Sequence, residues 1–162
     1  MDKATLLKSM TETRAVWEAL LAQFDEEQMI QPGAAGKWSV KDIIAHCTWG
    51  EREVAPVLRT HVLAGSDLWK LSDDERNEII YQQNKDRPLR DIVNEEGQAY
   101  TALFGAVQTL SDEDLNDPQR FKDMPPEWKP WQLIAGDSFK HYEDHMPSIR
   151  EWLEKKKDEQ KH

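Results

Sequence analysis

The chain has 162 residues, enough for one domain with a buried core. Its 31 acidic and 21 basic residues give a formal net charge of -10, so we expect neither nucleic acid nor a membrane surface as a partner. A single cysteine, Cys47, excludes an internal disulfide and a cysteine-rich zinc site. No stretch approaches the ~20 apolar residues of a membrane span, and no signal peptide is visible, so we expect a cytoplasmic protein.

Apolar residues recur at steps of three and four in four long segments, which predicts four long helices. The first covers residues 4–24 and is followed by a loop that ends near Trp38. The second begins at Ser39, which forms a capping box with Asp42. It contains Pro56, which we expect to kink or divide it.

Three further helices follow in the second half of the chain. A short helix is expected over residues 72–83, opened by a second capping box. The third long helix covers 88–110, and a loop rich in proline and acidic residues then leads to the last helix, at 130–156. Pro147 lies inside that last helix, where we expect a kink.

These elements predict an all-α protein. Four long helices without a convincing strand are typical of a four-helix bundle, here with an extra short helix between the second and third long helices. We expect residues 1–162 to form a single domain. The charged tail, residues 154–162, is expected to fray.

Two histidines, His141 and His145, lie four residues apart on the face of the last helix that also carries Ile134 and Ile149. A third, His46, lies in an apolar part of the second helix. Neutral imidazole is a common ligand of zinc and nickel, and three protein ligands with an open position are the pattern of catalytic zinc sites. One such histidine alone would be more typical of a buried ring bonded to a neighbour, but two on one face with a third in a comparable setting predict a divalent metal site.

Other residues near the histidines are candidates for supporting roles. Glu53 lies two turns after His46 and is a candidate general base, with a salt-bridged helix residue as the alternative. Gly50 is expected to leave space beside His46. Asp144 is expected to lie off the histidine face.

Aromatic residues are candidates for a substrate pocket. We expect Trp49, Tyr81, Tyr142 and Trp131 to line it. Core packing is the alternative role for each of them.

Two segments carry a resemblance to a known family. KWSVKDIIAHCTWGE and HYEDHMPSIREW resemble the second-helix and last-helix motifs of the DinB-like four-helix bundle superfamily. NKDRPLRDIV and WQLIAGDSFKHYEDH are most similar to its ClbS/DfsB-like branch. The resemblance implies a DinB-type bundle with a divalent metal, often nickel or zinc, on three histidines, which correspond by position to His46, His141 and His145. It also implies a homodimer.

Two functions remain open at this point. The first is a metal-dependent hydrolase or thiol transferase that acts on a small molecule, as the resemblance implies. The second is a protein that binds or sequesters a small molecule without catalysis, in the manner of self-resistance proteins. The absence of a proton-transfer residue in register with the histidines favours the second.

Overall fold

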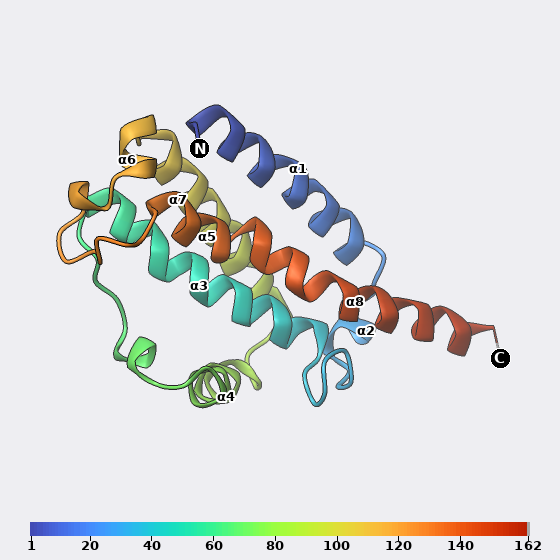
Figure 1. Cartoon of the computed structure of the whole chain (residues 1–162). Coiled ribbons are helices and arrows are strands. Elements are labelled where there is room, and N and C mark those ends of the chain that lie inside the picture. The colour runs from blue at the N-terminus through green and yellow to red at the C-terminus, as the bar shows by residue number, and fades with distance from the viewer. Residues whose placement is uncertain (162) are drawn as a thin grey trace.

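The computed structural model describes residues 1–161, and within them the chain is all-helical, with no strand (Figure 1). The helices are α1 (Lys3–Leu21), α2 (Glu26–Ile30), α3 (Val40–Thr60), α4 (Asp73–Asn84), α5 (Leu89–Gln108), α6 (Asp112–Asn116), α7 (Pro130–Gly136) and α8 (Phe139–Gln160), with short 3-10 helices η1 (Asp67–Lys70) and η2 (Pro118–Arg120). The long helices α1, α3, α5 and α8 form the bundle. The predicted fold class and the extra helix, α4, are confirmed.

Helix α3 is the central element of the bundle. It packs along α5 and also contacts α2, α4 and α8, while α1 packs against α8 and α5. Of its 21 residues, 13 are buried. Its start is fixed by the predicted capping box, in which Ser39 and Asp42 each bond to the other's backbone N–H.

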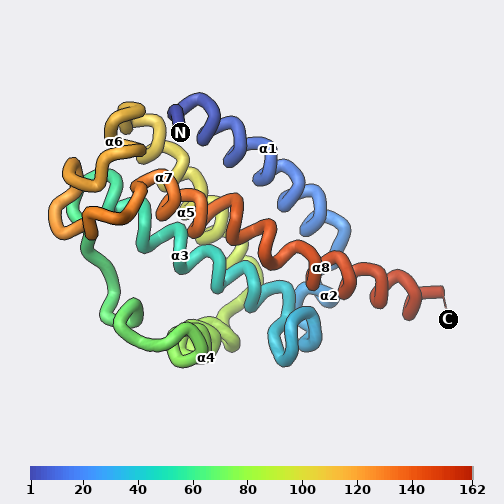
Figure 2. The backbone as a smooth tube through the Cα atoms, viewed as in Figure 1, coloured from blue at the N-terminus to red at the C-terminus, as the bar shows by residue number. Residues whose placement is uncertain are grey.

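The core has two clusters of buried apolar residues, which meet near the middle of α3 and near the start of α8. The first contains Leu6 and Phe139, and the second contains Trp17 and Tyr142. His141 therefore lies at the level where the two clusters meet. Figure 2 shows that a long connection leads from α3 to α4, and that the end of α8 projects beyond the bundle.

The last helix differs from its prediction. The predicted helix over 130–156 is divided into α7 and α8, because the backbone of Ser138, with φ -131° and ψ -108°, leaves the helical region. Pro147 does not interrupt α8, and α3 likewise continues undivided through Pro56. Each proline removes one backbone hydrogen bond, and the packed turns around it hold the helix together. The charged tail, which was expected to fray, is helical as far as Gln160.

The first helix also ends earlier than predicted, at Leu21. The following segment, predicted as a loop, contains α2, whose start is fixed by a capping box between Asp25 and Gln28. A helix of five residues is too short to give a recognisable apolar period. Within the described residues, no helix is long and apolar enough to cross a membrane.

Candidate metal centre

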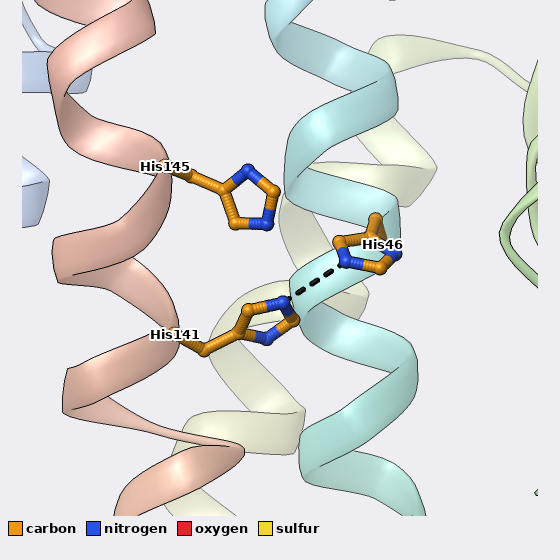
Figure 3. Close-up of side chains that lie close together, drawn as sticks. All are labelled: His46, His141 and His145. Atoms are coloured by element: carbon orange, nitrogen blue, oxygen red, sulfur yellow. Dashed lines mark hydrogen bonds between the residues drawn. The ribbon is translucent and has the colours of Figure 1, made fainter. Parts of the chain in front are cut away.

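Three histidine side chains converge from two helices. His46 projects from α3, and His141 and His145 project from α8 into the space between the helices (Figure 3). One ligand atom from each ring lies within 4.8 Å of the others. The Nε2 atoms of His46 and His141 are 2.9 Å apart. The structure therefore brings together the three histidines that the spacing on the last helix and the apolar setting of His46 grouped.

The burial of these rings keeps them neutral. Burial, together with the repulsion from His141 and His145, lowers the pKa of His46 to about 3. Burial and the neighbouring His145 lower the pKa of His141 to about 4, and burial lowers the pKa of His145. A neutral imidazole has a free lone pair, which is the form that binds a metal.

The donor set fits a divalent metal ion. Zn–N distances of about 2.0–2.1 Å place the nitrogens of a tetrahedral site about 3.3 Å apart. The three ring nitrogens are already within 4.8 Å of one another. Two Nε2 atoms that face each other are satisfied either by one shared proton or by one shared cation.

A cavity of about 290 Å³ opens beside the histidines. Helix α4 contributes Asp73 and Arg76 to its wall, and Arg76 donates a hydrogen bond of 2.5 Å to Asp73. Trp69 also lines it. Asp144, which was expected off the histidine face, is part of the lining as well, so that expectation is wrong.

Asp137 is a residue of this cavity that the sequence did not reveal. A Cβ atom on Gly50 would lie 2.6 Å from Asp137 Oδ1, so the carboxyl occupies the space that Gly50 leaves. Burial raises the pKa of Asp137 to about 6, with Arg76 opposing and Glu53 adding to the shift. A carboxyl group of this kind is suited to proton transfer near neutral pH.

Asp137 escaped the sequence reasoning because the apolar stripe continues across the break between α7 and α8. Gly136 and Ser138 flank it, and such residues often mark a helix end. These two residues were the one indication in the sequence that a helix ends near Asp137.

Glu53 binds N–H groups beside the histidine cavity. Its Oε1 accepts hydrogen bonds from the backbone N–H of Ser66, at 2.6 Å, and from Nε1 of Trp69, at 3.0 Å. It does not line the cavity. Its observed contacts anchor the segment that contains η1, while the role of general base stays a prediction.

The four aromatic candidates have different positions. Trp49 lines the histidine cavity. Tyr81 stacks on Trp38, with ring centroids 6.2 Å apart, and Trp38 in turn lies 5.2 Å from the His46 ring. Tyr81 therefore belongs to a second layer around the site.

Tyr142 and Trp131 do not line the histidine cavity. The hydroxyl of Tyr142 donates to buried Glu51 and accepts a hydrogen bond of 3.0 Å from Arg14. Burial raises the pKa of Glu51 to about 8, against the opposing effects of Tyr142 and Arg14. Trp131 packs on the first core cluster, with the Lys140 ammonium 5.5 Å from its ring centre.

The fold and the site define an all-helical bundle protein with a three-histidine cluster between two of its long helices. The chain belongs to the DinB superfamily, whose sequence model matches residues 9–147. This confirms the resemblance at the level of the superfamily. A search of curated proteins gives no match.

Solved structures share the whole fold. DfsB, described as "Sibling Lethal Factor Precursor", is similar over 96% of this chain and 97% of its own, with a TM-score of 0.80 and 16% identity. An uncharacterised protein from Escherichia coli UTI89 has a TM-score of 0.79 at 13% identity over 96% and 95% of the two chains. A protein from Streptococcus pneumoniae has a TM-score of 0.77 at 15% identity over 95% and 91%. These likenesses show the shared fold.

Proposed function

We propose that the chain binds one divalent ion, zinc or nickel, through His46, His141 and His145, and acts on a small molecule as a metal-dependent hydrolase or thiol transferase. The observation that carries the proposal is the approach of three ligand atoms to within 4.8 Å of one another. Membership of the DinB superfamily supports it. A divalent ion held by three imidazoles supplies Lewis-acid chemistry at its open position.

The side chains around the histidines have separate tasks in this proposal. Asp137 faces the same cavity and is placed to accept or return a proton of the reacting molecule. The indole rings of Trp49 and Trp69, whose centroids are 4.8 Å apart, limit the access of water. Arg76 adds a positive charge to the wall of the cavity. This charge suits a substrate whose negative charge grows during the reaction.

Metal analysis of the purified, tag-free protein tests the proposal. We expect close to one zinc or nickel ion per chain, and loss of that ion in the His141→Ala/His145→Ala variant. His61→Asn is the matched control, because His61 lies outside the cluster and adopts a left-handed backbone conformation that Asn tolerates. A wild-type protein without metal after loading with zinc and nickel would contradict the proposal.

The second candidate is binding or sequestration of a small molecule without turnover. Within residues 1–161, no hydrogen bond joins His46, His141 or His145 to a carboxylate. Catalytic metal sites usually have such a bond to orient each imidazole. Recovery of a bound molecule unchanged after long incubation with the metal-loaded protein would favour this candidate.

A further inference from the structure

A second cavity, of about 500 Å³, adjoins the histidine cavity. Its apolar lining comes from α3, from the chain between α3 and α4, from α7 and from the loop before α7; these residues are Val54, Val57, Leu63, Trp69, Trp128 and Leu133. The two cavities share Trp69 and Asp137. A molecule in the second cavity would therefore reach towards the metal centre.

Two exposed tryptophans line this one cavity. Trp69 is 41% exposed and Trp128 is 40% exposed, whereas the other five tryptophans of the chain are buried or half-buried. An exposed indole leaves a large apolar area in water, which is unfavourable. Two of them around one concave surface are typical of a binding site for a small apolar or aromatic ligand.

The wall of the cavity is built in advance of any ligand. Glu53 Oε1 holds both the Ser66 N–H and the Trp69 indole N–H, and the Arg76 guanidinium lies 4.9 Å from the centre of the Trp69 ring. Gly65 allows this close approach, because a Cβ there would lie 3.1 Å from Glu53 and from Trp69. A preformed wall binds a ligand without the entropic cost of ordering it.

The charge around the cavity selects against anions. Glu53, Asp67 and Asp137 contribute carboxyl groups. Lys70 is the one cation of the lining, and its ammonium is 2.9 Å from Asp67. The face of the Trp128 ring also attracts positive charge, as the Trp69 ring already does with Arg76.

We propose that this cavity binds the aromatic part of a neutral or cationic small molecule, between Trp69 and Trp128, and directs its reactive end past Asp137 to the histidine centre. The inference rests on the proposed function, because it assigns the substrate class of the same site. It also gives Glu53 a positioning role, as the anchor of the Trp69 wall.

Titration of the full-length, metal-free protein with a neutral fluorophore, N-phenyl-1-naphthylamine, tests the cavity. We expect saturable binding with one probe per chain, weakened about tenfold or more by Trp128→Gln. The anionic probe 8-anilinonaphthalene-1-sulfonate should bind more weakly than the neutral one. Val93→Gln is the matched control: Val93 is 41% exposed and lines a separate groove between α1, α2 and α5.

The result that would overturn the proposal is equal probe affinity in Trp128→Gln and the wild type, loss of binding in Val93→Gln, or preference for the anionic probe. Glu53 supplies a second comparison. Glu53→Gln keeps an oxygen that accepts both hydrogen bonds and should bind the probe as the wild type does, whereas Glu53→Ala should bind it more weakly. Equal weakening by both variants would remove the positioning role.

Metal content, measured on the same variants purified without metal removal, separates this inference from the proposed function. Trp128→Gln should lose the probe and keep the metal, and His141→Ala/His145→Ala should do the reverse. A wild type without metal, but with binding that depends on Trp128, would refute the proposed function and leave the cavity supported. A wild type that holds metal, but whose probe affinity is unchanged by Trp128→Gln, would refute the cavity alone.

Discussion

At the scale of single residues, one step along α8 separates two environments. His141 faces the histidine cluster, and Tyr142, turned by about 100° around the helix, faces the second core cluster. Its ring stacks on Trp17, with centroids 4.6 Å apart, and its hydroxyl joins Arg14 to Glu51. The alternative role expected for Tyr142, core packing, agrees with these contacts.

Tyr142→Phe should therefore affect stability and leave the metal content unchanged. Removal of the hydroxyl leaves the buried groups of Glu51 and Arg14 with one partner fewer, and we expect a loss of about 1–3 kcal/mol in the free energy of unfolding. Urea denaturation and metal analysis check the two parts. Tyr81→Phe, for which no hydrogen bond from the hydroxyl is observed, is the control and should change stability little. Loss of metal in Tyr142→Phe would place Tyr142 in the site after all.

A second prediction concerns acid stability. Burial alone would raise the pKa of Asp114, but hydrogen bonds from Ser111 and Arg120 outweigh it and hold the pKa at about 2, below the ordinary 3.8. Because the folded-state value is the lower one, the carboxylate stabilises the fold above pH 3.8, and this contribution is lost as the pH falls towards 2.

The melting temperature of Asp114→Asn, compared with that of the wild type, tests this. The variant should melt at a lower temperature at neutral pH, and the gap should close as the pH falls from 3.8 towards 2. A gap that stays constant over that interval would contradict the assigned hydrogen bonds.

At the scale of elements, the long helices were predictable because each carries an apolar stripe several turns long. The break at Ser138 was not, since Ile134, Ser138 and His141 keep the helical spacing across it. Pro147 was the stronger signal of a helix break in the sequence, yet it lies inside continuous α8. A proline removes one hydrogen bond, and tertiary packing decides whether the helix bends or ends there.

Two glycines in different elements should respond in opposite ways to alanine. Gly33 has φ +121° and a Cβ there would lie 2.8 Å from the Trp152 ring, so Gly33→Ala should destabilise the protein by more than about 1 kcal/mol. Gly97, inside α5, has open space around it, and Gly97→Ala should stabilise by about 0.5–1 kcal/mol. Thermal denaturation of both variants checks the pair. A stable Gly33→Ala would contradict the described loop.

At the scale of the whole molecule, the site combines segments that are far apart in sequence. The spacing of His141 and His145 is local and could be read from the chain, and the apolar setting of His46 identified the third member of the cluster. Trp69 and Arg76 reach the same cavity only because η1 and α4 fold back beside α3. No periodicity encodes that contact. Homodimerisation and a cytoplasmic location stay predictions, and sedimentation velocity would test the first.

Metal binding should be linked to the stability of the whole bundle. An ion that binds only the folded chain raises the free energy of unfolding, by about 2.7 kcal/mol when its free concentration is a hundred times Kd. Zinc should therefore raise the melting temperature of the wild type and of His61→Asn, but not that of His141→Ala/His145→Ala. An equal rise in all three proteins would indicate binding elsewhere on the chain.

The most direct test of the proposed metal centre is X-ray absorption spectroscopy at the metal edge of the zinc-loaded protein. Three imidazoles from His46, His141 and His145 predict nitrogen scatterers at about 2.0–2.1 Å, together with the outer-shell pattern of imidazole rings. The pattern should weaken in His46→Ala. A sulfur scatterer at about 2.3 Å, or a shell of oxygen alone, would contradict the three-histidine centre.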